Sequence, residues 1–169
     1  MNTTFLKDSS RSSVNELTKT AMVAALYVAV TVLLAVFSFG NIQLRLAEMF
    51  NYLALYNKRY VVAITLGVVL ANFMSPTWML DVPIGGIATF LVLILCRKVT
   101  KRLTSEIWKI AITAIIFALS MFTVAGQLAI MLEFPFWYTY LTVGLSELFS
   151  MTVGGIAIYL LNKRIDLSK

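Results

Sequence analysis

A single acidic residue stands inside the most apolar part of the sequence. Glu147 lies within residues 141–161, and no Lys or Arg occurs within ten residues of it on either side. Charged groups within membrane spans are costly and rare, so each is by default a candidate functional group. Two interpretations remain open: Glu147 recognises a ligand, or it is a protonated or hydrogen-bonded carboxyl that joins neighbouring helices.

A second pair of charges has the spacing of one helical face. Arg45 and Glu48 are three residues apart, which makes them neighbours on a helix. They form either a structural ion pair that holds an outer loop in place or part of a ligand site. In a ligand site, the guanidinium would grip a planar molecule through its carbonyl or ring-nitrogen acceptors.

Further polar and aromatic residues are expected at the same membrane depth. Taken singly, a buried amide is more often an interhelical hydrogen-bonding group, and a Trp or Tyr is more often an interfacial anchor. Their shared depth, which is the only basis for placing them together, favours a binding site in which rings stack on a flat heterocycle. The candidate substrate-binding residues are Arg45, Glu48, Asn72, Trp78, Asp81, Gln127, Trp137, Tyr138 and Glu147.

The basic residues predict the elements that would position this site. Thirteen of the 14 Lys and Arg residues fall into four clusters separated by apolar stretches, and the exception is Arg45. Basic residues accumulate on the cytoplasmic side of membrane proteins. If all four clusters are cytoplasmic, each of the three segments between them must cross the membrane and return. This predicts six membrane crossings, with both termini cytoplasmic. The clusters are Lys7, Arg11 and Lys19; Lys58 and Arg59; Arg97, Lys98, Lys101, Arg102 and Lys109; and Lys163, Arg164 and Lys169.

The composition defines the class of protein. Of the 169 residues, 60% are hydrophobic and 13% are charged, whereas soluble domains carry about 25% charged residues. Six crossings of roughly 20 residues each leave no room for a soluble domain. We therefore expect an all-α integral membrane protein with one domain over residues 1–169. It would begin with a polar cytoplasmic segment, 1–17, and end in a cytoplasmic tail, 163–169.

Several function classes are disfavoured by what the sequence lacks. The net charge is +6, but the basic residues flank apolar spans, so lipid phosphates account for them better than nucleic acid does. The chain has no His and one Cys, which removes the usual general base, the commonest metal ligand and an internal disulfide. No cofactor, metal site or catalytic residue is expected, and the chain is not expected to be an enzyme. Because a Walker A loop is also missing, uptake would need ion coupling or a separate energising partner.

Apolar stretches and breakers predict the boundaries of the spans. The second span is too short to cross fully and would be reached through a loop that dips into the protein, which is tolerated only where protein or water surrounds it. Trp78 and Asp81 are expected in an outer loop. The predicted spans are residues 16–39, closed by a turn at 40–41, then 44–55, 60–73, 84–96, 107–132 and 136–162, with outer loops at 75–83 and 133–135.

The charges outside the basic clusters predict the preference of the site. In the outer half of the chain, one cation, Arg45, accompanies four anions, Glu48, Asp81, Glu133 and Glu147. A small ligand that is cationic and has hydrogen-bonding edges would match this balance. The predicted site therefore faces outward and carries an excess of carboxylates.

The first span also carries a ladder of small residues. Ala21, Ala25 and Ala29 recur at four-residue spacing, and such a stripe allows another helix to approach closely. Two interpretations are open: packing against the protein's own helices, and docking of a partner protein at the cytoplasmic side.

Taken in order, these motifs resemble those of a known family. The segment 42–48, with Arg45 and Glu48, is similar to an Arg-x-x-Glu segment that enters the second helix of QueT proteins. These proteins are substrate-binding S components of energy-coupling factor (ECF) transporters. Departures occur at 49–50, 53–54 and 145–146. The remaining matches are Ala21-x-x-x-Ala25, Leu66-Gly67, Ala71-Asn72, Asp81, Gly85, Ala88-Thr89 and Gly144 to Glu147.

The resemblance implies a function and partners. A QueT protein would be a six-helix S component in the plasma membrane of a prokaryote. It would capture a queuosine precursor, a 7-deazaguanine such as preQ1, preQ0 or queuine, from outside. A T subunit, docking on Ala21, Ala25 and Ala29, and two ABC ATPases would then drive delivery. The alternatives are an S component for another vitamin or nucleobase-like molecule and a self-sufficient small secondary transporter.

Overall fold

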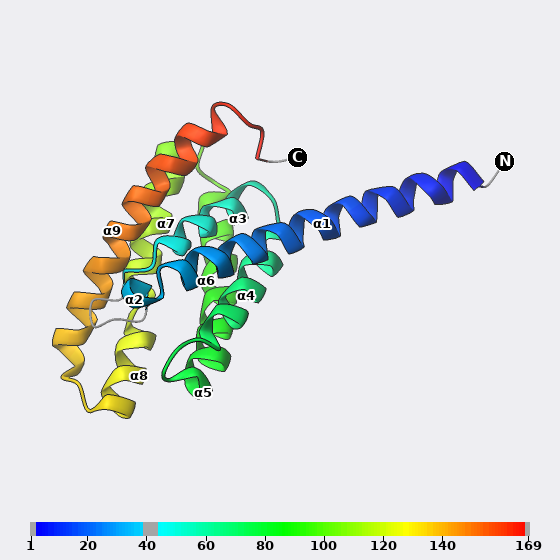
Figure 1. Ribbon diagram of the computed structural model, residues 1–169. Coiled ribbons are helices and arrows are strands. Elements are labelled where there is room, and N and C mark those ends of the chain that lie inside the picture. Colours follow the sequence, from blue (N-terminus) through cyan, green and yellow to red (C-terminus); the bar gives the residue numbers. More distant parts are fainter. Residues whose placement is uncertain (1–2, 39–43, 168–169) are drawn as a thin grey trace.

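The computed structural model describes residues 3–38 and 44–167, and within these ranges the chain forms helices and turns but no strand (Figure 1). The turn predicted at 40–41 and residues 42–43 of the family-like segment lie outside the described residues. The helices are α1 (Thr3–Leu33), α2 (Ala35–Ser38), the 3₁₀ helix η1 (Leu46–Tyr52), α3 (Leu53–Tyr56), α4 (Arg59–Asn72), α5 (Trp78–Leu80), the π-helix η2 (Asp81–Gly85), α6 (Gly86–Thr100), α7 (Glu106–Ser120), α8 (Phe122–Leu132) and α9 (Phe136–Asn162).

Four helical stretches are long and apolar enough to cross a membrane, which confirms the all-α membrane class. They are Val14–Leu33, Trp78–Thr100, Glu106–Leu132 and Phe136–Asn162. The other two predicted crossings are shorter helices. α4 has 14 residues, and a helix of that length covers about 21 Å of a bilayer core of about 30 Å.

One predicted loop was wrong, and one predicted span, confirmed at Glu106–Leu132, contains a break that was not predicted. The outer loop predicted at 75–83 is helical from Trp78 onward, and η2 runs without interruption into α6. Pro83 lies within η2, a π-helical turn that interrupts the regular α-helical hydrogen-bond ladder, and a proline removes one bond of that ladder. The fifth span is divided at Met121 into α7 and α8. Ser120 Oγ donates to the Phe117 carbonyl at 2.7 Å, a type of bond that bends helices.

The short segment formed by η1 and α3 lies inside the bundle. η1 packs against α1, α4 and α9, and Tyr52 is fully buried, with its hydroxyl donating to the Met151 carbonyl at 2.9 Å. Gly154 of α9 makes the close approach possible, since a methyl group added there would overlap the Cβ of Met49. Protein therefore surrounds the segment that is too short to cross.

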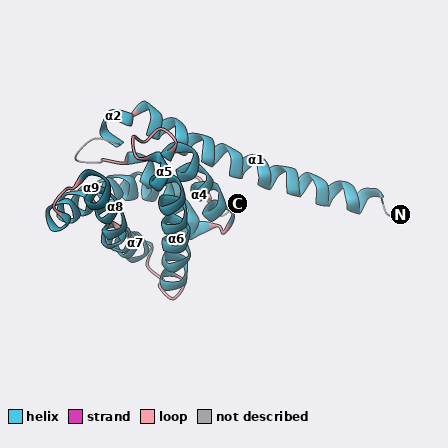
Figure 2. Ribbon diagram, turned by 90° about the horizontal axis from the view of Figure 1, so that it is seen from below, coloured by secondary structure: helices cyan, strands magenta, loops and turns pink. Residues whose placement is uncertain are grey.

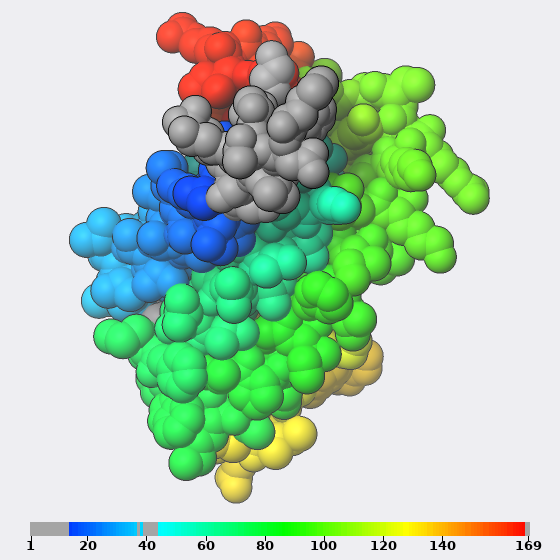
Figure 3. Space-filling model, turned by 90° about the vertical axis from the view of Figure 1, so that its right-hand side faces the viewer, coloured from blue at the N-terminus to red at the C-terminus, as the bar shows by residue number. Residues whose placement is uncertain are grey.

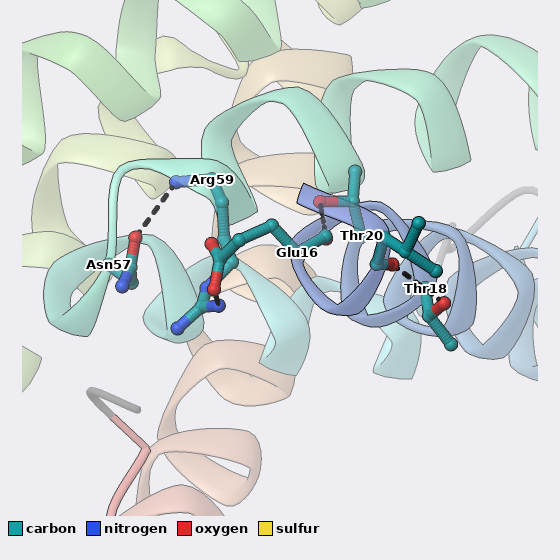
Figure 4. A network of polar contacts seen from close by, with 6 residues as sticks. Glu16, Thr18, Thr20, Asn57 and Arg59 are labelled. Atoms are coloured by element: carbon teal, nitrogen blue, oxygen red, sulfur yellow. Dashed lines mark hydrogen bonds and ion pairs between the residues drawn. The ribbon is translucent and has the colours of Figure 1, made fainter. Parts of the chain in front are cut away.

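α1 crosses one side of the bundle and is held there by packing and by an ion pair. Its N-terminal half projects away from the other helices (Figures 1 and 2), and the rest lies along α4, where both helices are visible on one face (Figure 3). Gly67 of α4 leaves room for the Tyr27 side chain of α1, since a Cβ added there would lie 2.8 Å from the Cβ of Tyr27. At the start of α4, the Arg59 guanidinium pairs with Glu16, and the Arg59 amide donates to Asn57 Oδ1 at 3.1 Å (Figure 4).

The bundle has two chemically different ends. The α3–α4 turn, the α6–α7 turn and the segment after α9 meet at one end, here called the basic end (Figure 1). The other end, formed by α5 and the α8–α9 turn, is here called the acidic end, because it carries Asp81 and Glu133. Between the ends, large apolar side chains are exposed on the outer faces, among them Leu91, Ile115 and Leu145, as expected where the solvent is lipid. The basic end carries Lys58, Arg59, Arg97, Lys98, Lys101, Arg102, Lys109, Lys163 and Arg164.

Candidate functional site

Glu48 occupies the centre of the bundle. A 3₁₀ helix has three residues per turn, so Arg45, which precedes η1, and Glu48 lie on the same face. Glu48 is only 4% exposed. The Tyr27 hydroxyl of α1 donates to its Oε1 at 2.9 Å, and the Asn51 amide donates to its Oε2. Two neutral donors therefore fix the carboxylate of Glu48 at this position.

Glu147 reaches the same region from α9. It is 1% exposed, and it interacts electrostatically with both Glu48 and Arg45. Three predicted site residues that are distant in sequence are thus brought together by α9 packing on η1. With Tyr27 and Asn51, they form what we call the inner cluster: Tyr27, Arg45, Glu48, Asn51 and Glu147.

The inner cluster contains buried polar atoms whose hydrogen-bonding capacity is unused within the described chain. Oε1 of Glu147 and Oδ1 of Asn51 find no hydrogen-bond partner among the described residues. Buried polar atoms are normally hydrogen-bonded, and leaving one unsatisfied costs about 1–3 kcal/mol. Two acceptors that point into the protein interior are therefore available to a molecule that carries N–H donors.

A cavity of 30 Å³ adjoins this cluster. A single water molecule needs roughly 10–15 Å³ measured in this way, so the space is too small for a bicyclic heterocycle until side chains move. Gly85, Ala88 and Thr89, which belong to the family-like segments, form part of its wall. The lining residues are Arg45, Glu48, Val68, Gly85, Ala88, Thr89, Val92, Phe117, Ser120, Met121, Thr123 and Val124.

Asp81 belongs to a separate polar network nearer the acidic end. Ser75 and Thr77 donate to its Oδ2, the latter at 2.7 Å, and Gln127 of α8 donates to its Oδ1 at 3.1 Å. Asn72 of α4 donates to the Asp81 backbone carbonyl at 2.7 Å. The structure therefore brings Asn72, Asp81 and Gln127 together, and the network ties α4, η2 and α8 to one another.

The three predicted aromatic residues lie apart from the cavity. Trp137 and Tyr138 are 73% and 69% exposed on the first turn of α9, and Trp78 is 44% exposed. Trp137 packs edge-on against Phe136 with ring centroids 5.1 Å apart, and Trp78 contacts Phe73 at 6.0 Å. None of the three lines the cavity in this conformation. Their positions match those of interfacial aromatic residues.

The alanine ladder faces outward. Ala21, Ala25 and Ala29 are all exposed, whereas Ala24 and Tyr27 of the same helix are buried. α1 therefore turns Ala24 and Tyr27 toward the bundle and the ladder away from the described chain. On the outside of the bundle, the ladder lies beside the exposed side chains of Met22 and Leu26.

Two members of the inner cluster were not predicted from the sequence. Tyr27 lies in the middle of a span, away from the interfaces where Tyr is common, and a buried Tyr hydroxyl usually has a partner. Asn51 follows Glu48 by three residues, which is the spacing of one 3₁₀ turn. Among the residues that the structure describes, no three His, Cys, Asp or Glu side chains lie close enough together to hold a metal ion.

Helices of membrane-spanning length around a buried polar cluster and a small cavity define a polytopic membrane protein. Residues 17–163 match the family model for QueT transporters, and the chain belongs to this transporter family. It is 38% identical over 168 residues to "Queuosine precursor transporter QueT" of Lactococcus lactis subsp. cremoris strain MG1363, an alignment that covers 94% of this chain and 99% of the relative. No solved structure matches the chain.

Proposed function

We propose that the protein takes up a queuosine precursor, a 7-deazaguanine such as preQ1, preQ0 or queuine, across the plasma membrane of a prokaryote. The observation that carries the proposal is the similarity to the Lactococcus queuosine precursor transporter, which extends over nearly the whole of both chains. The inner cluster supports it, because Arg45, Glu48 and Glu147 meet beside a cavity.

Each charged member of the inner cluster has a role in this proposal. The carboxylates of Glu48 and Glu147 accept hydrogen bonds from the guanine-like N–H edge and from the ammonium of an aminomethylated precursor. Arg45 donates to the ring carbonyl. The unpartnered Oε1 of Glu147 supports this assignment, because a ligand N–H would satisfy it.

The network around Asp81 serves as the gate to the cavity in this proposal. Gly85 lines the cavity and lies four residues after Asp81, in the same π-helix. Breaking the bond from Gln127 would release η2 from α8, and breaking the bonds from Ser75 and Thr77 would release it from the turn after α4. Both changes would widen the cavity, which is now 30 Å³. Trp78, Trp137 and Tyr138 would then cover or stack on the heterocycle from the acidic end, which faces outside.

Energy for uptake comes from partner proteins in this proposal. The chain lacks a Walker A loop, so the proposed partners are a T subunit and two ABC ATPases of the ECF type, with this chain as the S component. The exposed ladder of Ala21, Ala25 and Ala29 supports docking of the T subunit, because it is not covered by the protein's own described helices.

Reconstitution tests this proposal against a self-sufficient transporter. Liposomes that contain the purified chain alone are expected to accumulate no labelled preQ1, whereas liposomes that also contain the T subunit and both ATPases, with ATP inside, accumulate it. Accumulation by the chain alone would contradict the dependence on partners. Accumulation of another labelled nucleobase in place of preQ1 would contradict the substrate.

A further inference from the structure

A cavity of 430 Å³ at the basic end is lined mainly by cationic side chains. α6 contributes Arg97 and Lys98, the residue after it contributes Lys101, and α7 contributes Lys109. Leu55 of α3 and Thr100 complete the wall. The cavity shares no lining residue with the 30 Å³ cavity and none of its lining residues belongs to the inner cluster, so it is separate from the site proposed for the substrate.

The cations around this cavity are not neutralised by the described chain. The Arg97 guanidinium donates to the Ala54 carbonyl, which holds one cation in place at the cavity wall. Lys98, Lys101 and Lys109 form no ion pair with a carboxylate among the side chains that the structure describes, those of residues 14–36, 38 and 44–167. Four positive charges at one concave site attract an anion with several oxygen acceptors, and a phosphate group has this character.

The basic cavity continues into an apolar groove. A second cavity, of 220 Å³, shares Leu55 and Lys109 with the first, and a third, of 320 Å³, shares Ile110 with the second. The third cavity is a groove between α7 and α9, and its wall is almost wholly apolar. Its lining residues are Tyr52, Ile107, Ile110, Ala111, Ala114, Thr152, Gly155, Ile156 and Tyr159.

Two further groups constrain where a phosphate would bind. Glu106 lines the second cavity and accepts hydrogen bonds from the Tyr56 hydroxyl and, at 2.7 Å, from the Asn162 amide. Its negative charge disfavours a phosphate there and favours the first cavity. At the end of the groove, Lys163 Nζ lies 4.4 Å from the centre of the Tyr159 ring, so a cation also stands where the groove opens at the basic end.

We propose that this continuous surface binds an anionic phospholipid, with the phosphate among Arg97, Lys98, Lys101 and Lys109 and one acyl chain in the groove between α7 and α9. Basic pockets between membrane helices are suited to anionic lipid headgroups. A free phosphate would satisfy the cations equally well, but it would leave the adjoining groove unused. The exposed Ile107 and Ile156 side chains place that groove on the lipid-facing surface, which favours a lipid as the source of the phosphate.

Native mass spectrometry of the detergent-purified full chain tests the proposal. The chain is titrated with dioleoylphosphatidylglycerol, with dioleoylphosphatidylcholine and with inorganic phosphate. We expect saturable binding of the phosphatidylglycerol at a concentration at which phosphatidylcholine does not bind. Each basic residue near an anionic lipid contributes about a fivefold gain in affinity, so Lys101→Gln combined with Lys109→Gln should weaken binding roughly twentyfold or more.

A matched charge control is Lys58→Gln combined with Arg164→Gln, which removes two exposed cations of the basic end that do not line the cavity. This variant should bind the lipid as the unaltered chain does. Ala111→Trp fills the groove and should weaken binding, whereas Ala157→Trp, on an exposed position of α9 outside the groove, should not.

Three outcomes would overturn the proposal. Equal binding of the two lipids would show that the cations do not distinguish an anionic lipid from a zwitterionic one. Equal losses of lipid affinity in the two double Lys/Arg variants would show only a general effect of charge. Displacement of phosphatidylglycerol by inorganic phosphate at a similar concentration, together with unchanged binding to Ala111→Trp, would assign the cavity to a free phosphate. Circular dichroism of each variant verifies that it is folded.

Discussion

Replacement of Glu147 by Gln tests the buried carboxylate at the centre of the proposed site. The substitution keeps the size and one acceptor oxygen of the side chain but removes its charge. Glu147 is 1% exposed and its Oε1 has no hydrogen-bond partner in the described chain, so a ligand donor placed there is shielded from water. A hydrogen bond to a charged group contributes about 1.5–3 kcal/mol. Loss of the charge should therefore weaken ligand binding by at least about 1.4 kcal/mol, or tenfold.

The same substitution should not lower the stability of the protein without ligand. Glu147 lies near the carboxylate of Glu48, and a neutral amide at that position carries no charge to be desolvated or repelled. The thermal midpoint of the ligand-free variant in detergent is therefore expected to equal or exceed that of the unaltered chain. A loss of binding that is accompanied by a large fall in this midpoint would indicate a structural role for Glu147.

Calorimetric titration with preQ1 measures the effect directly. Glu133→Gln is the matched control, since Glu133 is exposed at the α8–α9 turn and does not belong to the inner cluster. We expect the control to bind preQ1 as the unaltered chain does. Unchanged affinity in Glu147→Gln, in a folded protein, would remove this residue from the site and refute the reasoning.

Three further substitutions test other parts of the structure. Glu48→Gln should also weaken preQ1 binding at least about tenfold by titration, because the charge that meets the ligand is lost; unchanged affinity would exclude Glu48. Ala25→Trp should abolish uptake in cells while leaving ligand binding intact, and loss of both would indicate that Ala25 has an internal packing role. Gly154→Ala should destabilise the protein by about 1–3 kcal/mol, seen as a lower thermal midpoint, because its methyl group would overlap Met49. Gly126→Ala, where an added Cβ meets nothing within 4 Å, is the control, and equal midpoints in the two glycine variants would contradict the packing described for η1.

The sequence predicts well those elements that physical chemistry encodes locally. The last helix was predicted at 136–162 and is observed there, because Pro135 provides a clear start and the basic Lys163 and Arg164 follow its end. The second segment was also predicted to be short and helical, and it is observed as η1 and α3. Its 3₁₀ form was not predicted, since close packing on Gly154 and on α1 is a tertiary constraint.

For the polar residues too, the sequence identifies single residues but not the contacts that tertiary packing creates. Glu147, Glu48 and Arg45 could be identified because charge in an apolar sequence is conspicuous. Their proximity depends on α9 packing against η1, which no local pattern encodes. Asp81 was assigned to a loop because Pro76 and Pro83 flank it, and the helical turns that it joins are held by partners from α8 and from the turn after α4. Tyr27 was missed because a tyrosine in an apolar span resembles any other large side chain until its partner is known.

Ligand titration of the detergent-purified chain, followed by its thermal midpoint, tests the central claim most directly. The ligands are preQ1, preQ0, queuine and guanine. We predict saturable stabilisation by at least one deazaguanine, with preference for the aminomethylated preQ1 because its ammonium meets Glu48 or Glu147. Absence of stabilisation by all four ligands, in a chain shown to be folded, would contradict the proposal that the inner cluster binds a queuosine precursor.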